Sequence, residues 1–143
     1  MNNNKGFTLI ELMVVLVILG ILASRIVPMI LGRVDDAKFT DAKLDIQALE
    51  TALKLYKLDN GDFPTTEQGL LALVEPPEAE GTLKNWKKGG YLEKGRVPKD
   101  PWGNDYVYLC PGQHGPFDLM SYGMDGEPGG EDNNQDVNNW EIQ

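Results

Sequence analysis

An apolar run near the amino terminus constrains this chain more than any other feature of its sequence. Residues 7–24 carry a single charged side chain, that of Glu11. A run of about 20 apolar residues is long enough to cross a bilayer as a helix, so we expect a transmembrane and assembly helix over residues 7–31. Lys5 precedes the run, and by the positive-inside rule this end stays in the cytoplasm. The rest of the chain is therefore expected outside the inner membrane, in the periplasm.

The order of the first residues differs from that of an ordinary secretory signal. There, a small-residue cleavage site follows the apolar core. Here the small residue, Gly6, precedes the apolar run. Cleavage after Gly6 would make residues 1–6 a leader peptide and would leave the apolar helix on the mature protein. A glycine has no Cβ, which gives a protease close access to the backbone.

Glu11 is the unusual residue of the apolar run. A carboxylate in an apolar environment costs several kcal/mol unless it is paired. Its side chain either reaches the lipid headgroups or pairs with a cation inside an assembly. Cleavage would create such a cation, the α-amino group of Phe7, in the same chain or in a neighbouring one.

The distribution of charge excludes several functions. The formal net charge is -9, and residues 100–143 contain nine acidic residues but no lysine or arginine. An acidic carboxyl-terminal part argues against a nucleic-acid partner, which needs basic patches. The only cysteine, Cys110, is expected to be a small buried or half-buried residue, and the only histidine, His114, to pack or to form hydrogen bonds. The sequence has no phosphate-binding loop or nucleophile motif, so we do not expect an enzyme.

Residues 32–143 are expected to form a periplasmic globular domain. Pro28 should kink or locally melt the first helix, and helix should resume by Asp35 and continue to Leu58. Apolar side chains recur in this second helix at spacings of three and four and predict a buried stripe. The stripe consists of Phe39, Ala42, Ile46, Leu49, Leu53 and Tyr56.

The remaining residues predict a small sheet and several turns. A turn and a short helix follow residue 62, with Thr65 or Thr66 as its cap, and Trp86 and Tyr91 are expected to anchor an irregular segment. Alternation predicts strands over residues 105–110 and 117–122 with a hairpin loop between them. The fold class is therefore α+β. A long helix, half transmembrane and half amphipathic, packs on a small antiparallel β-sheet.

A glycine-rich acidic loop lies near the carboxyl terminus. Residues 125–136 include five carboxylates among 12 residues. Oxygen-rich loops suit a hard cation such as calcium. The loop is not an EF-hand, because its fifth position is Gly129 and a strand precedes it. On composition alone it is either a calcium site or a solvated acidic turn.

Several motifs together resemble a known family. Residues 5–11, Lys-Gly-Phe-Thr-Leu-Ile-Glu, followed by the apolar helix, resemble the class III signal of type IV pilins and pseudopilins. Residues 56–70, 100–106 and 111–115 resemble later motifs of the major pseudopilin of type II secretion systems. The resemblance covers nearly the whole chain. Adhesive pilins usually carry a carboxyl-terminal disulfide, which a chain with one cysteine cannot form.

The resemblance implies how the amino terminus is used. A prepilin peptidase would cleave between Gly6 and Phe7, and Phe7 would be N-methylated. Glu11 would neutralise the Phe7 amine of a neighbouring subunit during assembly. Arg25 departs from the family pattern, because such helices usually stay apolar there, and it would face headgroups or a neighbouring subunit.

The resemblance also implies a structural calcium ion in the acidic loop. Two side chains and three backbone oxygens are the implied ligands, and Asp132 is an alternative. The side chains are those of Asp125 and Asp136, and the backbone oxygens are those of Leu119, Ser121 and Val137.

The implied function is that of a fibre subunit. An inner-membrane assembly platform and its ATPase would extract the subunit from the lipid into a helical homopolymer, together with minor pseudopilins. This periplasmic fibre would drive export of folded proteins across the outer membrane. The alternatives are a true type IV pilin and a monomeric, membrane-tethered calcium-binding module.

Overall fold

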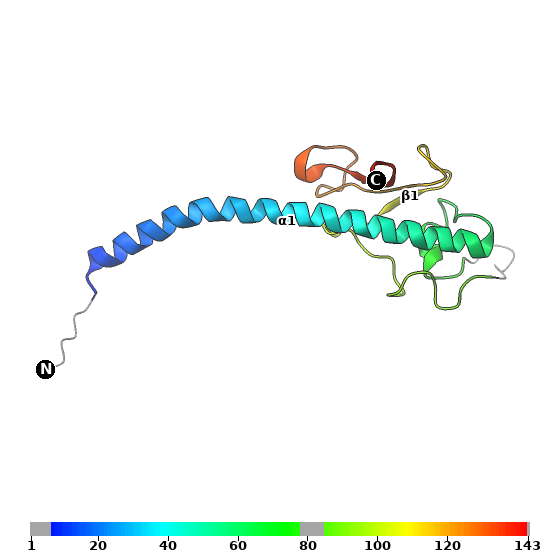
Figure 1. Ribbon diagram of the computed structural model, residues 1–143, viewed down its shortest axis with the longest axis horizontal. Helices are drawn as coiled ribbons and strands as arrows, with labels where there is room; N and C mark the ends of the chain where they lie inside the picture. The colour runs from blue at the N-terminus through cyan, green and yellow to red at the C-terminus, as the bar shows by residue number, and fades with distance from the viewer. Residues whose placement is uncertain (1–6, 78–84, 143) are drawn as a thin grey trace. The chain divides into compact units, whose positions relative to one another are not determined.

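The computed structural model describes residues 7–77 and 85–142 of the chain (Figure 1). Residues 1–6, including the expected cleavage residue Gly6, lie outside this range. The chain divides into two units, Met1–Ala37 and Lys38–Gln143. The elements in chain order are α1 (Leu9–Asn60), η1 (Leu70–Leu73), β1 (Val107–Leu109), β2 (Asp118–Ser121), η2 (Asp132–Asn134), β3 (Val137–Asn138) and η3 (Asn139–Glu141).

Helix α1 is continuous over 52 residues and passes through Pro28. The expected local melting at Pro28, with helix resuming by Asp35, is therefore wrong. A proline inside a helix removes its own N–H from the hydrogen-bond ladder and its ring crowds the carbonyl four residues earlier, at a cost of about 3 kcal/mol, but its fixed φ is compatible with a helix. The residues on both sides supply the remaining bonds of the ladder, so the helix tolerates the loss.

The carboxyl-terminal half of α1 provides the spine of the second unit, as its apolar periodicity predicts. The expected stripe is buried, and only Phe39 is partly exposed. Ala52 joins the stripe because it lies one turn from its neighbours on the same helix face. The core therefore forms along one side of the helix, where the sheet covers it (Figure 1).

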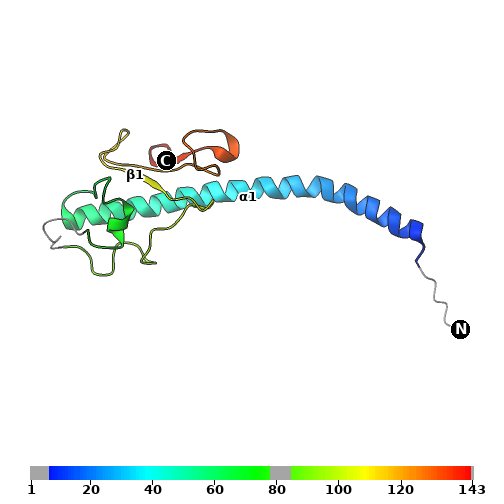
Figure 2. The same cartoon turned by 180° about the vertical axis from the view of Figure 1, so that it is seen from behind.

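The sheet has three antiparallel strands in the order β1-β2-β3. Tyr108 of β1 pairs with Leu119 of β2, and Ser121 of β2 pairs with Val137 of β3. The strands β1 and β2 lie inside the two predicted strands and are shorter. Strand β3 was not predicted from the sequence. It places the carboxyl-terminal segment next to β2 on the side away from β1. The carboxyl-terminal segment, coloured orange to red, lies on the same side of α1 as β1 (Figure 2).

Two tyrosines of the β1 region fasten the sheet to other elements. The hydroxyl of Tyr106 donates a hydrogen bond to Oδ2 of Asp45 on α1, at 3.1 Å. The hydroxyl of Tyr108 donates to the backbone oxygen of Pro64, at 2.8 Å. Burial raises the pKa of Tyr106, and the neighbouring Asp45 carboxylate raises it further. Both hydroxyls therefore stay protonated and act as donors.

The predicted short helix forms as the 3-10 helix η1. Thr65 and Gln68 close the turn before it, because Thr65 Oγ1 accepts the N–H of Gln68 at 3.2 Å and Gln68 Oε1 accepts the N–H of Thr65 at 2.9 Å. The cap residue of η1 is Gly69, which uses no side-chain bond. Thr65 thus caps the preceding turn, and the expectation of a threonine cap on the helix itself is wrong.

Trp86 and Tyr91 anchor the segment that follows, as predicted. Trp86 Nε1 donates a hydrogen bond to the Ala72 backbone oxygen at 3.0 Å. The Tyr91 hydroxyl accepts a bond from Asn60 Nδ2 at 2.9 Å. The two aromatic rings also meet edge to face. The irregular segment is thereby tied to both η1 and the end of α1.

Candidate functional site

The start of α1 places Glu11 in the first helical turn. Thr8 Oγ1 accepts the N–H of Glu11 at 3.3 Å, and the Thr8 backbone oxygen accepts the N–H of Leu12 at 3.2 Å. A threonine followed three residues later by a glutamate is a known start signal for helices. The helix therefore begins at Leu9, directly after Thr8, and the negative side chain of Glu11 lies at the positive end of the helix dipole. This signal is visible in the sequence, although the helix start was predicted from the apolar run alone.

The amino-terminal part of α1 exposes nearly all of its large apolar side chains. Phe7 is 83% exposed, and every leucine, isoleucine, valine and methionine from Leu9 to Leu22 is also exposed. An apolar surface of this extent requires either lipid or other protein chains to cover it. Among the residues that the structure describes, no helix reaches the length and apolar character needed to cross a membrane.

Among the described side chains, no cation lies beside Glu11. The ion pairs among the described residues include those that join Lys54 to Glu50, Lys99 to Asp105 and His114 to Asp118, and none of these involves Glu11. The Phe7 nitrogen belongs to a peptide bond as long as residues 1–6 are attached, so it carries no charge. The side chain of Arg25 is not among the described parts of the structure. Processing of the chain, or another molecule, can supply a partner for the Glu11 carboxylate.

The acidic loop over residues 125–136 is closed at its base by the sheet. Ser121 at the end of β2 lies directly opposite Val137 at the start of β3. The three backbone oxygens expected as ligands, those of Leu119, Ser121 and Val137, thus come from two neighbouring strands. The sheet register brings these residues together without help from the loop.

Asp136 has the arrangement expected of a cation ligand. Its Oδ2 accepts the N–H of Gly129 at 2.9 Å. Its Oδ1 is buried and has no hydrogen-bond partner among the described residues. A buried acceptor without a partner costs about 1–3 kcal/mol, and more when it is charged. A hard cation bound to Oδ1 would remove this cost, so the residues present fit calcium.

The other two carboxylates of the prediction are more open. Asp125 is exposed, and its Oδ1 accepts the N–H of Glu127 at 3.1 Å. Asp132 begins η2 with a positive φ of 53° and is also exposed. Within residues 7–77 and 85–142, no three acidic, histidine or cysteine side chains are gathered closely enough to hold a metal. A cation here would depend on backbone oxygens as well as on the carboxylates.

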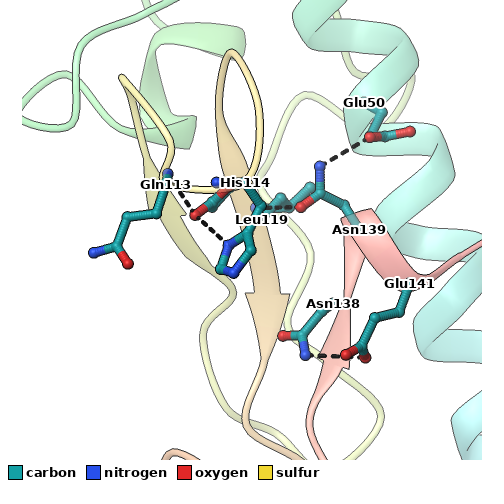
Figure 3. Close-up of polar contacts among 8 residues, drawn as sticks. Glu50, Gln113, His114, Leu119, Asn138, Asn139 and Glu141 are labelled. Carbon is teal, nitrogen blue, oxygen red and sulfur yellow. Dashed lines mark hydrogen bonds and ion pairs between the residues drawn. The ribbon is translucent and has the colours of Figure 1, made fainter.

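His114 and Asp118 form a second polar cluster beside β2 (Figure 3). His114 Nδ1 lies 3.0 Å from Asp118 Oδ2, and the His114 ring stacks on Trp140 with centroids 3.8 Å apart. The buried Asp118 carboxylate also accepts the N–H groups of Gln113 and His114, at 2.8 and 3.1 Å. The predicted packing and hydrogen-bonding role of His114 is confirmed, and Trp140 packs back on the domain through this stacked pair.

These bonds set the protonation state of Asp118. Burial by itself would raise the pKa of this carboxyl, but the N–H of Gln113, the His114 side chain and the N–H of His114 together lower it below its ordinary value. Asp118 is therefore ionised near neutral pH. It organises the turn over residues 111–115 as an acceptor.

Asn139 connects three parts of the second unit (Figure 3). Its Oδ1 accepts the N–H of Leu119 on β2 at 2.9 Å, and its Nδ2 donates to Glu50 Oε1 on α1 at 3.1 Å. This role was not predicted from the sequence. A single asparagine between Asn138 and Trp140 gives no periodic signal, and its partners lie 20 and 89 positions away along the chain.

Cys110 is half-buried, as predicted. Its N–H donates to Thr66 Oγ1 at 2.8 Å, and its backbone oxygen accepts from the same hydroxyl at 3.0 Å. Its thiol lies 3.6 Å from the backbone oxygen of Pro116. The cysteine thus joins the end of β1 to the turn around Thr66.

Comparison with known proteins places this arrangement in a family. Residues 29–140 match the family model described as type II secretion system (T2SS), protein G. Residues 1–24 match the model described as the prokaryotic N-terminal methylation motif. The two matches together cover the helix, the sheet and the acidic loop.

Individual relatives are similar over nearly their whole length. The type II secretion system core protein G of Pseudomonas aeruginosa is 58% identical over 137 residues, which are 96% of this chain and 95% of that protein. The protein of the same name from Vibrio cholerae is 53% identical over 143 residues, which are all of this chain and 96% of that protein.

A solved structure is similar to the fold described above. The crystal structure of the major pseudopilin from the type 2 secretion system of enterohaemorrhagic Escherichia coli matches with a TM-score of 0.65 and 44% identity. The match covers 77% of this chain and 92% of that one. The expected α+β fold, a long amino-terminal helix with a small antiparallel sheet, is thereby confirmed.

Proposed function

The chain belongs to the protein G family of type II secretion systems, and from that premise we propose that it is the major pseudopilin, the repeating subunit of the pseudopilus fibre. Proteins of this family are structural subunits. The observation that carries the proposal is the exposed apolar surface from Phe7 to Leu22 with one carboxylate in its first turn. A fibre built from this helix would cover the surface with copies of itself.

Processing would supply the missing partner of Glu11. The match to the N-terminal methylation motif supports cleavage between Gly6 and Phe7 by a prepilin peptidase, with N-methylation of the new terminus. The Phe7 amine is then a cation four residues from Glu11 in its own chain and able to meet Glu11 of a neighbouring subunit. Pairing two charges in an apolar environment removes much of the penalty of each, provided that their geometry is good.

The same surface would hold the subunit in the inner membrane before assembly. Residues 7–31 would cross the bilayer once, with the globular domain in the periplasm. An assembly platform and ATPase in that membrane would move the subunit into the growing fibre, and minor pseudopilins would join it. Growth of the fibre would then push folded proteins toward the outer-membrane channel.

The proposal is tested by the substitution Glu11→Gln, which removes the negative charge of the side chain and leaves its size almost unchanged. In cells with the assembly machinery, the full-length Glu11→Gln variant should insert and be processed but form few fibres. Glu67→Gln removes a charge from an exposed turn and should assemble normally. Electron microscopy of sheared fibres and immunoblots of the membrane fraction measure both steps. Fibres from Glu11→Gln at the parent level would contradict the pairing role.

The same experiment separates the two alternatives. A monomeric membrane tether would give no fibres and no subunit ladder after crosslinking, even for the parent chain. A true type IV pilin would assemble with pilus machinery and not with secretion machinery. The relatives' names and the major pseudopilin structure favour the secretion system.

We also propose that the acidic loop binds a structural calcium ion. The support is the buried, unpartnered Oδ1 of Asp136 and the closure of the loop base by Ser121 and Val137. Asp125 and Asp136 would contribute carboxylate oxygens, and Leu119, Ser121 and Val137 backbone oxygens, with Asp132 as the alternative carboxylate. The ion would supply positive charge among carboxylates that otherwise repel one another.

A bound calcium ion would make the stability of the domain depend on the ion. Excess calcium should raise the melting temperature of the parent chain relative to chelator, because a ligand that binds only the folded state stabilises it. Asp136→Asn should abolish most of this rise, whereas Glu131→Gln on the exposed part of the loop should retain it. An equal melting temperature with calcium and with chelator in the parent would exclude a structural ion.

A further inference from the structure

A buried aspartate outside the acidic loop organises the turn over residues 100–104. Asp100 is 4% exposed, and its Oδ1 accepts the N–H groups of Trp102 at 3.1 Å and Asn104 at 2.7 Å. The backbone closes the same turn, because the Asp100 N–H donates to the Asn104 oxygen at 2.9 Å. Three bonds to one residue leave this turn little freedom to deform.

Two side chains of this turn form hydrogen bonds with residues at and just beyond the end of β2. Asp100 Oδ2 accepts the hydroxyl of Ser121 at 2.6 Å, and Ser121 Oγ accepts the N–H of Gly123 at 3.3 Å. Asn104 Nδ2 donates to the backbone oxygen of Gly123 at 3.0 Å. Both backbone polar groups of Gly123 are therefore held by side chains that the turn positions.

Gly123 is the point where the chain enters the acidic loop, two residues before Asp125. It has a positive φ of 63°, and a Cβ there would lie 2.8 Å from the backbone oxygen of Gln135. The backbone at the start of the loop, at Gly123, therefore lies in direct contact with the backbone at its end, at Gln135, which precedes Asp136. A side chain at Gly126 would touch the amide of Asn104 at 3.4 Å, so Asn104 lies against the loop on both sides of Asp125.

We infer that Asp100 and Asn104 are positioning residues for the cation site, which present the Ser121 backbone and Asp125 to the ion that Asp136 binds. This inference rests on the proposed calcium site. The two residues act through Ser121 and Gly123. Without these two side chains, the segment that leads into the loop would become ordered only when the ion binds. The entropy lost in that ordering would lower the affinity of the loop for calcium.

A sequence motif that the fibre function leaves unexplained gains a role from these contacts. Residues 100–104, Asp-Pro-Trp-Gly-Asn, lie about 20 positions before the acidic loop and contain none of the expected ligands. Asp100 supplies acceptors for the turn, and Asn104 supplies the amide that reaches Gly123. The motif therefore belongs to the cation site, although it lies outside the loop.

The test measures calcium affinity in the full-length chain in mild detergent, by titration calorimetry with calcium chloride as the probe. Asn104→Ala removes the bond to Gly123 and should raise the Kd for calcium by roughly 10–100-fold, the usual effect of losing a group that orients metal ligands. Asn60→Ala is the matched control. It removes two amide hydrogen bonds, to the Tyr56 oxygen and the Tyr91 hydroxyl, at the carboxyl-terminal end of α1.

Affinity and stability together distinguish positioning from simple support of the fold. Both variants should melt below the parent in chelator, but only Asn104→Ala should change the Kd. A Kd for Asn104→Ala within about twofold of the parent value, combined with a lowered melting temperature, would overturn the inference while leaving the calcium site intact. A parent chain that binds no calcium would overturn the calcium site itself.

Discussion

Asn139 offers a prediction in which two adjacent asparagines serve as test and control. Asn139→Ala removes the acceptor of the Leu119 N–H and the donor to Glu50 (Figure 3). Asn138→Ala is the same substitution one residue earlier. It removes only the exposed bond from Asn138 Nδ2 to Glu141 Oε2, at 3.1 Å.

The expected cost follows from what each variant leaves without a partner. Leu119 is 0% exposed, so its N–H would be buried and unsatisfied, at a cost of about 1–3 kcal/mol. The Glu50 side chain is 24% exposed, so solvent reduces the value of its bond to about 0.5–1 kcal/mol. Asn139→Ala should therefore lower the free energy of unfolding by about 2–3 kcal/mol, and Asn138→Ala by about 0.5 kcal/mol or less.

Urea unfolding of the full-length chain in a mild detergent measures both values. Calcium must be fixed by excess ion in one series and by chelator in another, because binding shifts the apparent stability. For a soluble unit of this size, a loss of 2–3 kcal/mol corresponds to a melting temperature lower by on the order of 10 °C. Equal unfolding free energies for the two variants would refute the idea that Asn139 ties the carboxyl terminus to β2 and α1.

Three further predictions concern the leader, the acid stability and the loop entrance. Gly6→Asp should block processing, and mass spectrometry should find the full-length amino terminus; a mature amino terminus at Phe7 in this variant would count against the leader assignment. The lowered pKa of Asp118 contributes stability that is present above the unfolded pKa of about 3.9 and is lost as the pH falls through the folded pKa. Asp118→Asn should therefore be less stable than the parent at pH 7 and should lose less stability between about pH 4 and pH 2. Unfolding followed by circular dichroism at each pH measures this difference. The same pH dependence in both proteins would contradict the hydrogen bonds assigned to this carboxylate. Gly123→Ala should lower the free energy of unfolding by about 1–3 kcal/mol more than Gly61→Ala. Both glycines have a positive φ, but only at Gly123 would a Cβ lie 2.8 Å from a backbone oxygen. Equal melting temperatures for the two variants would disprove this close approach.

The amphipathic helix was the part of the fold that the sequence predicted best. Its stripe from Ala42 to Tyr56 repeats over several turns, so each apolar residue supports the same assignment. Pro28 was misjudged because a local rule was applied without the surrounding helix. The loss of one backbone hydrogen bond at Pro28 is small compared with the many backbone hydrogen bonds of the 52-residue helix, so the helix continues through the proline.

Strand β3 shows where reasoning from local sequence fails. It has two residues, Val137 and Asn138, and two residues cannot display an alternation. Its existence depends on pairing with Met120 and Ser121, which lie almost 20 positions earlier. Such a strand is stabilised by its neighbour, and no property of its own residues predicts it.

The candidate sites were predictable to different degrees for a similar reason. The leader, Glu11 and the acidic loop are contiguous motifs, and their residue types indicate their chemistry. Asp100, Asn104 and Asn139 act at a distance through single hydrogen bonds. Their identity as polar residues was visible, but their partners emerge only when the chain is folded.

The two environments proposed for α1 indicate which feature controls assembly. Lipid tails are as apolar as leucine side chains, so moving the exposed surface of residues 9–22 from lipid into a fibre gains little hydrophobic free energy. In the proposed function the Glu11 carboxylate would differ between the two states, because in lipid only the Phe7 amine of its own chain is near, whereas in the fibre the Phe7 amine of a neighbouring subunit would also meet it. A carboxylate left unpaired in an apolar environment costs several kcal/mol. In this proposal the apolar run would make both states possible, and the single charge within it would favour the fibre over the dispersed subunit.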